Sequence, residues 1–63
     1  MVYRSTHHHA VTYHKGERVK FNDWPAVITE GGHKFGAIAF TIDETDTTIK
    51  LGPYDEVWPE KVL

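Results

Sequence analysis

The chain has 63 residues, a formal net charge of −2 and no cysteine. This length leaves room for one small domain, which buries only about 60% of the surface that its unfolded chain exposes. Disulfides and thiolate metal sites are excluded, so oligomerisation is a further source of burial. No apolar stretch approaches the roughly 20 residues of a membrane helix, and the N-terminal residues lack the apolar region of a signal peptide. We therefore expect a cytoplasmic protein without a membrane partner.

The charge is distributed unevenly along the chain. Residues 1–42 contain five Lys or Arg and three Asp or Glu, whereas residues 43–63 contain six acids and two lysines. Proteins that bind duplex nucleic acid carry a basic excess, because neutralising phosphates supplies much of their affinity. The overall balance favours a protein or peptide partner instead.

The first half of the chain predicts an arm followed by short strands. Residues 1–14 are interpreted as an N-terminal arm, with a short extra strand over residues 10–14. Residues 17–21 alternate, with Val19 and Phe21 on one face, as a half-buried strand does. Residues 22–25 (NDWP) predict a loop, because Asn and Asp favour turns and proline restricts the residue before it.

The middle of the chain predicts the central strand of the sheet. An extended run at residues 26–30 leads into Gly31–Gly32, where we expect a tight reversal. Residues 35–42 (FGAIAFTI) form the longest apolar segment, with two apolar faces, and are expected to be the central, strongly bent strand. Gly36 would allow a bulge or a close backbone approach.

The last third predicts a hairpin and a final strand. Residues 43–46 (DETD) have the composition of a polar hairpin turn, and residues 47–51 alternate as a strand. Pro59-Glu60-Lys61 predicts one 3₁₀ turn before the last strand. The expected fold is therefore all-β, a single small five-stranded barrel over residues 15–63, because a sheet curled on itself hides its edges.

Two segments resemble the Src-homology-3-like small barrels, the group that includes Tudor, chromo-barrel and KOW-type domains. Lys15-Gly16-Glu17-Arg18-Val19 is similar to the opening of many such barrels, and Val57-Trp58-Pro59-Glu60-Lys61-Val62-Leu63 is similar to their closing strand, 3₁₀ turn and final strand. The chain has no ALYDY-like signature, no Trp-Trp pair and no glycine-centred KOW turn. The resemblance implies a binding module and names no ligand class.

The histidines and acids predict no cofactor, no metal site and no enzyme. His7, His8, His9 and His14 lie close in sequence, but no further ligand stands at a spacing that would complete a tetrahedral site. Residues 43–46 lack the glycine and the distal glutamate of a calcium loop. Neither a nucleophile elbow nor a phosphate-binding glycine loop is present.

The aromatic residues are the main candidates for partner binding. Phe21, Phe35 and Phe40 fall on predicted strands and are expected in the core. Trp and Tyr are frequent anchors of interfaces, since they offer an apolar body and a polar tip. The candidate partner-binding residues are Trp24, Tyr54, Trp58 and Tyr13. The resemblance would gather the first three in one groove, although Trp58 fits the core equally well.

Two further functions stay open at this point. Arg18, Lys20 and Lys34, with Tyr13 near them, form a basic strand face that would bind a phosphate backbone or single-stranded bases. The alternative is that this face is the solvent-exposed side of a strand and binds no ligand. The chain is otherwise interpreted as an accessory subunit that is stable only inside a larger complex, and a homo-oligomer is one such arrangement.

Overall fold

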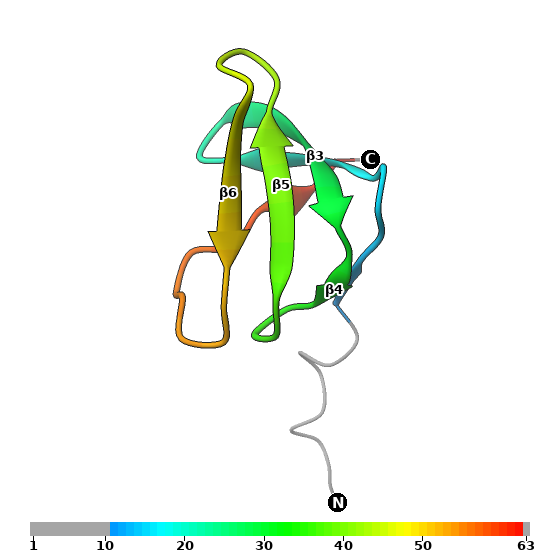
Figure 1. The fold of residues 1–63 in the computed structure, drawn as a ribbon, viewed down its shortest axis with the longest axis vertical. Helices are drawn as coiled ribbons and strands as arrows, with labels where there is room; N and C mark the ends of the chain where they lie inside the picture. The colour runs from blue at the N-terminus through cyan, green and yellow to red at the C-terminus, as the bar shows by residue number, and fades with distance from the viewer. Residues whose placement is uncertain (1–10, 63) are drawn as a thin grey trace, which may run out of the picture.

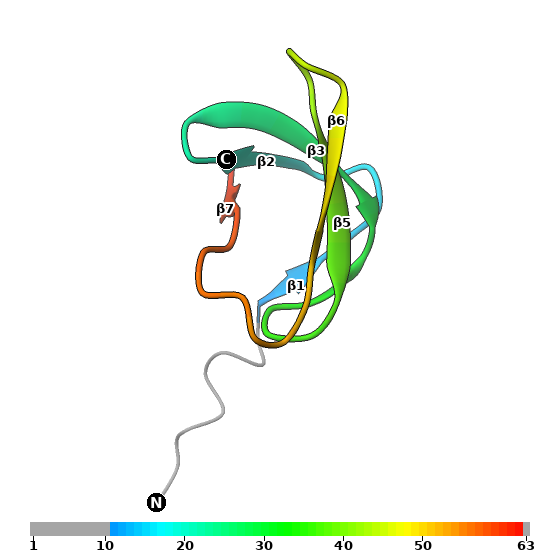
Figure 2. The same cartoon turned by 60° about the vertical axis from the view of Figure 1, so that its left-hand side comes forward.

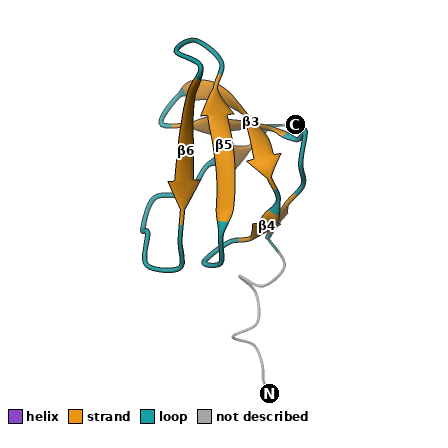
Figure 3. Cartoon of the chain, viewed as in Figure 1, coloured by secondary structure: helices purple, strands orange, loops and turns teal. Residues whose placement is uncertain are grey.

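A computed structural model describes residues 11–62, which form a small fold of strands and loops without a helix (Figures 1 and 3). The strands in chain order are β1 (Thr12–Tyr13), β2 (Arg18–Phe21), β3 (Trp24–Glu30), β4 (Gly32–His33), β5 (Ile38–Ile42), β6 (Thr47–Leu51) and β7 (Glu60–Lys61). The all-β prediction is thus confirmed. Nothing in this part of the chain is a helix of the length and apolarity needed to cross a bilayer. The predicted arm at residues 1–9 lies outside the described residues.

Five of the strands form one antiparallel sheet in the order β6-β5-β3-β2-β7, and β1 and β4 form a separate two-stranded ribbon. The larger sheet curls strongly, so that β7 lies opposite the β5–β6 hairpin (Figure 2). Its edge strands β6 and β7 do not pair with each other in residues 11–62, so the expected closed five-stranded barrel is not formed. The reason is the length of β7, whose two residues pair only with β2.

The core lies on the concave face of the curled sheet. Cross-strand neighbours on that face form rows, and the row through the middle is Ile28, Phe40 and Ile49. A second row runs through Val19, Ala26, Ile42 and Thr47, and the pair Phe21 and Trp24 lies beyond it. Val19, Ile28, Ile38 and Phe40 are the largest fully buried side chains. Two-residue alternation in each strand therefore directs the apolar side chains to one face.

The loop predicted at residues 22–25 is a tighter turn than expected. Asn22 and Asp23 alone connect β2 to β3, with φ of 53° and 71°. Two-residue hairpins favour turns in which both central residues have positive φ, a conformation that Asn and Asp tolerate. Trp24 and Pro25 consequently belong to β3, where Trp24 pairs with Phe21 and Pro25 with Lys20.

The reversal predicted at Gly31–Gly32 occurs three residues later. Gly32 and His33 continue as β4, and the chain turns at residues 34–36, where Gly36 donates a 2.9 Å hydrogen bond to the His33 carbonyl. Phe35, predicted in a strand and in the core, lies in this turn with φ of 67° and is 45% exposed. The ribbon with β1 causes the shift, because the pairs Thr12–His33 and Tyr13–Gly32 satisfy backbone groups that a turn would leave open.

The strand after this turn is shorter than predicted, and it does not lie at the centre of the sheet. β5 begins at Ile38, and the seven-residue β3 occupies the central position between β5 and β2. A bulge in β3 between Ile28 and Glu30 adds the bend that had been assigned to residues 35–42. Both faces of the first part of β5 are nevertheless covered, since Ile38, Ala39 and Phe40 are all buried.

The predicted 3₁₀ turn at Pro59-Glu60-Lys61 is not formed. Glu60 and Lys61 are β7 and pair with Lys20 and Val19. The free edge of β2 offers backbone donors and acceptors, and pairing with that edge satisfies more of them than an isolated turn would. Val62, which the predicted last strand would place in the core, follows β7 and is half exposed.

Lys61 connects the end of the described chain to its beginning. Its ammonium lies 2.9 Å from Glu17 Oε2, donates to the Thr12 carbonyl and stands 5.1 Å from the centroid of the Tyr13 ring. Glu17 in turn accepts a 2.9 Å hydrogen bond from the His14 backbone N–H. The hydrogen bond from Lys61, followed by that from His14, lowers the pKa of Glu17 below its usual value. This cluster ties β7 to the segment between β1 and β2.

We expect Gly32→Ala to destabilise the fold by at least about 1–3 kcal/mol, as overpacking does. A Cβ at Gly32 would lie 2.2 Å from the Ala37 carbonyl oxygen, a backbone atom that cannot rotate away. Gly52→Ala is the matched control, since its Cβ would meet only Asp55 Oδ2 at 3.9 Å. Urea denaturation measures both variants, and equal midpoints would contradict the close approach.

We expect Glu17→Gln to reduce the free energy of unfolding by about 0.5 kcal/mol at neutral pH, the size of a partly exposed ion pair. Because the folded-state pKa of Glu17 is lowered, its contribution is present above the unfolded-state pKa and is lost as the pH falls through the folded-state value. The variant should therefore approach the wild type in strong acid. Glu44→Gln is the control, because Glu44 lies in no ion pair of the described part. A difference in the free energy of unfolding between Glu17→Gln and the wild type that stays constant at every pH would contradict this linkage to the pKa of Glu17.

Candidate functional site

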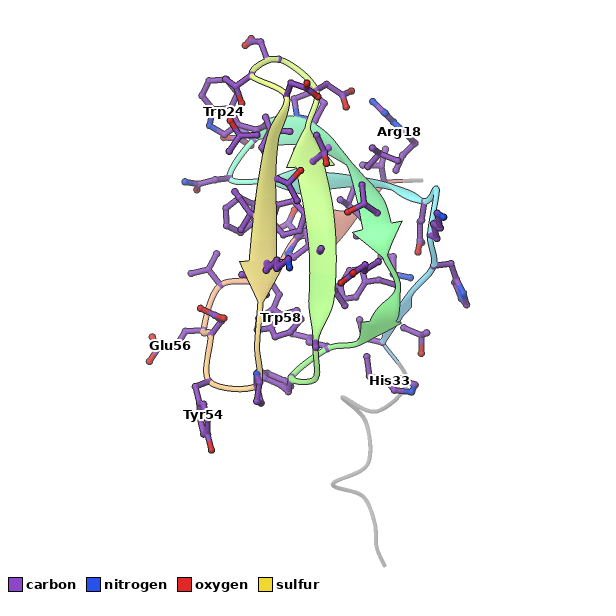
Figure 4. The ribbon with its side chains drawn as sticks, viewed as in Figure 1. Arg18, Trp24, His33, Tyr54, Glu56 and Trp58 are labelled. Carbon is purple, nitrogen blue, oxygen red and sulfur yellow. The ribbon has the colours of Figure 1, made fainter. Side chains whose placement is uncertain are left out.

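The two ends of the concave face differ in how the chain covers them. At one end the rings of Tyr13 and Trp58 stack with their centroids 6.3 Å apart, and the Phe35 ring lies 5.8 Å from that of Trp58. At the other end Trp24 stands beside the tip of the β5–β6 hairpin (Figure 4). The first end is sealed by aromatic side chains, and the second end holds the candidate site.

Tyr13, predicted as a partner contact, and Trp58, expected equally as a partner contact or as core, are both core residues. Tyr13 is 2% exposed and its hydroxyl donates a 2.7 Å hydrogen bond to the Pro59 carbonyl. Trp58 is 8% exposed and its indole Nε1 donates to the Asp55 carbonyl at 2.8 Å. Burial, with a smaller effect of the nearby Glu17 charge, raises the pKa of Tyr13. Each polar tip is satisfied by a backbone carbonyl, so these two rings stabilise the fold.

A hollow of about 250 Å³ opens beside Trp24, between the β2–β3 and β5–β6 hairpins. Its apolar walls are the side chains of Phe21, Trp24, Ile42 and Ile49, and its polar rim consists of Asn22, Thr45 and Thr47. The wall residues belong to the same concave face as the core, because Phe21 pairs with Trp24 and Ile42 with Thr47. We call this feature the Trp24 hollow.

The Trp24 hollow is open because no described strand extends over it. β7 pairs with β2 only at Val19 and Lys20, and so stops short of Phe21. Trp24 is 44% exposed as a result, although Ala26 and Ile42 on the same face are buried. A large indole half in water above an apolar depression is an unusual surface feature for a small monomer.

A backbone hydrogen bond and an ion pair hold the two hairpins of the hollow together. The Asp43 N–H donates to the Pro25 carbonyl at 3.0 Å, and the Asp43 carboxylate pairs with the Arg18 guanidinium. The other acids at this end, Asp23, Glu44 and Asp46, are exposed and lie in no ion pair among residues 11–62. The apolar walls are thus flanked by solvent-exposed carboxylates that no cation in residues 11–62 neutralises.

Tyr54 lies far from Trp24, at the opposite end of the long axis (Figure 4). It is 95% exposed in the loop between β6 and β7, beside the turn formed by Gly52 and Asp55. The groove that would gather Trp24, Tyr54 and Trp58 is therefore not formed. Of these three aromatics, Trp24 alone contributes to the hollow.

The three residues of the basic alternative do not form one patch. Arg18 and Lys20 share the outer face of β2, but Arg18 is paired with Asp43, and Lys20 borders a polar depression with Asp23 and Glu60. Lys34 lies in the turn after β4, at the far end from β2 (Figure 2), with its ammonium 5.3 Å from the Phe35 ring. Acids interrupt the positive potential that a phosphate backbone would follow.

The described residues contain no group of three His, Asp or Glu side chains positioned for a metal ion. His33, in β4, lies with Nδ1 3.1 Å from the Thr12 hydroxyl, and His14 is exposed. The cluster His7, His8 and His9 falls outside the described residues.

Local sequence patterns do not indicate most of the residues that line the Trp24 hollow. The sequence predicts Ile42, Thr47 and Ile49 only as parts of strands, and Thr45 only as part of a hairpin turn. One signal was available: Asn22-Asp23 between alternating apolar residues is a two-residue hairpin pattern, which makes Phe21 and Trp24 neighbours on one face. The approach of the second hairpin depends on the curl of the sheet, and no local pattern encodes it.

The two tryptophans should report their different environments. In Trp58→Phe the remaining Trp24 should emit at longer wavelength and be quenched strongly by acrylamide, because its ring is half exposed. In Trp24→Phe the buried Trp58 should emit at shorter wavelength and resist quenching. Steady-state fluorescence of both variants, each checked for a native circular-dichroism spectrum, measures this. Equal quenching would contradict the assignment of Trp24 to the surface.

Comparison with protein-family models, with curated proteins and with solved structures gives no match to this chain. The arrangement of residues 11–62 itself is therefore the basis for assigning a function. Its most distinctive element is the half-exposed Trp24 beside an open apolar hollow.

Proposed function

We propose that the chain is a non-enzymatic binding module that docks a peptide or protein partner over the Trp24 hollow. The observation that carries the proposal is the exposed indole of Trp24 beside the apolar walls of Phe21, Ile42 and Ile49. Buried Trp anchors and the pockets around them commonly dominate the energy of protein interfaces. The hollow gives such an anchor a neighbouring depression that a partner side chain can fill.

The size of the hollow supports a macromolecular partner over a free small molecule. Small-molecule sites typically have volumes of roughly 300–1,000 Å³ and enclose most of the ligand. The Trp24 hollow has about 250 Å³ and is open to solvent. It accommodates one large side chain, and the remaining affinity would come from the flanks of the partner.

The proposal retains the resemblance to Src-homology-3-like barrels at the level of fold. Its support is the consecutive antiparallel order β2, β3, β5 and β6, with β7 returning to pair beside β2. Such a return is the connection that a curled sheet needs if it is to approach a barrel. The proposed binding surface, however, is the hairpin end of the sheet and not the end that carries Trp58.

An accessory subunit that needs a larger assembly is the second function that an observation favours. Val57 and Val62 are more than half and about half exposed, respectively, next to β7. A purified chain that unfolds cooperatively as a monomer would argue against this second function. It would leave the docking proposal in place.

Selection of peptides from a random library tests the proposal. Phage-displayed peptides are enriched on the wild type, synthesised, and titrated against the wild type and Trp24→Ala. We expect Trp24→Ala to weaken binding by about tenfold or more, as the loss of an interface anchor does. Because Trp24 is half exposed, the variant should keep the native circular-dichroism spectrum.

Tyr54→Ala is the matched control, an exposed aromatic removed at the other end of the molecule. It should bind the same peptides as the wild type. Peptides that bind Trp24→Ala as tightly as the wild type would overturn the site. Failure to enrich any peptide would count against the function.

A further inference from the structure

We propose that the partner segment is an extended, cationic strand that pairs with the free edge of β6 and places one large apolar side chain in the Trp24 hollow. This inference rests on the proposed function and specifies its ligand and its binding mode. Three features carry it: the position of β6 in the sheet, the residues that β6 contributes to the hollow, and the charge around both.

The first feature is the unpaired edge of β6. β6 is the last strand in the order β6-β5-β3-β2-β7, so its outer edge faces no strand in the described part of the chain. Thr47 and Thr48 on this edge are exposed. The edge carries unpaired backbone donors and acceptors, and an added strand satisfies them at a spacing of about 4.8 Å.

The second feature is that β6 itself forms one wall of the hollow. The side chains of Thr47 and Ile49 point to the concave face, opposite Ile42 and Phe40 of β5. In a strand paired beside β6, every second side chain points to that same face. One of these side chains therefore lies over the hollow, within reach of Trp24 across it.

The third feature is the charge of the surrounding surface. Glu44 and Asp46 flank Thr45 on the rim, Asp23 follows Asn22, and none of the three acids has an ion-pair partner in residues 11–62. Lysine or arginine beside the apolar residue of the partner would lie against these carboxylates. Complementary charge of this kind steers association and disfavours partners of the wrong sign.

The same charge argues against a second copy of the chain as the occupant. Residues 43–63, which include β6 and both of its flanking loops, contain six acids and two lysines. Pairing of β6 with β6 of another copy would bring two such segments side by side. Like charges at an interface oppose association, whereas a cationic segment gains from the same field.

The sequences of the enriched peptides provide the first test. We expect Lys or Arg next to a large apolar residue, with few acids, in peptides that depend on Trp24. Glu44→Gln combined with Asp46→Asn should weaken their binding about threefold or more. Glu56→Gln, an exposed acid near Tyr54 (Figure 4), is the matched control and should leave binding unchanged. Raising the salt to about 1 M should reproduce the loss, because the Debye length falls to about 3 Å.

Backbone methylation of one enriched peptide tests the strand pairing. Replacing a single amide proton of the peptide with an N-methyl group should weaken binding about tenfold or more at every second position. Methylation at the positions between them should leave the affinity unchanged. This alternation is the signature of a strand that bonds to one neighbour. An even loss at all positions, or no loss, would overturn the addition to β6.

The outcomes separate this inference from the function beneath it. Peptides that require Trp24 but are neutral or acidic would overturn the cationic strand and keep the docking module. Peptides that bind Trp24→Ala as tightly as the wild type would overturn both the cationic strand and the docking site at the Trp24 hollow. Chains that dimerise through β6, seen as a doubled mass in light scattering and abolished by Thr48→Pro, would overturn the cationic peptide as the occupant of this edge.

Discussion

The packing of Tyr13 against Trp58 is the interaction on which the remaining arrangement depends. The two rings come from opposite ends of the described chain, and the hydroxyl of Tyr13 bonds to the carbonyl of Pro59, the residue after Trp58. A chain without cysteine has no covalent means of joining its ends. Buried aromatic area with satisfied polar tips performs that role here, and Lys61 adds a charged contact from β7 to Glu17.

The other end of the curled sheet is covered less completely. The two-residue β7 pairs with Val19 and Lys20, and its antiparallel register directs the chain after Lys61 away from Phe21. The last row of the concave face, Phe21 and Trp24, thus stays uncovered. The open hollow therefore follows from the shortness of β7 and from its place on the edge of β2.

Local patterns in the sequence predicted the strand class and several boundaries, but not the arrangement of the ends. Alternation predicted the strands at residues 17–21 and 47–51, and composition predicted the hairpin turn at residues 43–46. These three predictions are confirmed. Phe35 was misplaced because a left-handed backbone at a non-glycine residue has no simple sequence signal. The burial of Tyr13 and Trp58 and the meeting of two hairpins around Trp24 depend on contacts between distant segments, which single-strand periodicity does not contain.

The hairpin that joins β5 to β6 has a consequence for how such a domain can change over time. Its four connecting residues lie at the end of the molecule away from Trp58 (Figure 4), and loops of this kind tolerate insertion and substitution well. Alterations at residues 44–46 would reshape the rim of the Trp24 hollow, whereas Asp43 also holds the two hairpins together. The shape of the hollow can therefore vary through three loop positions without change to the packing of Tyr13 against Trp58.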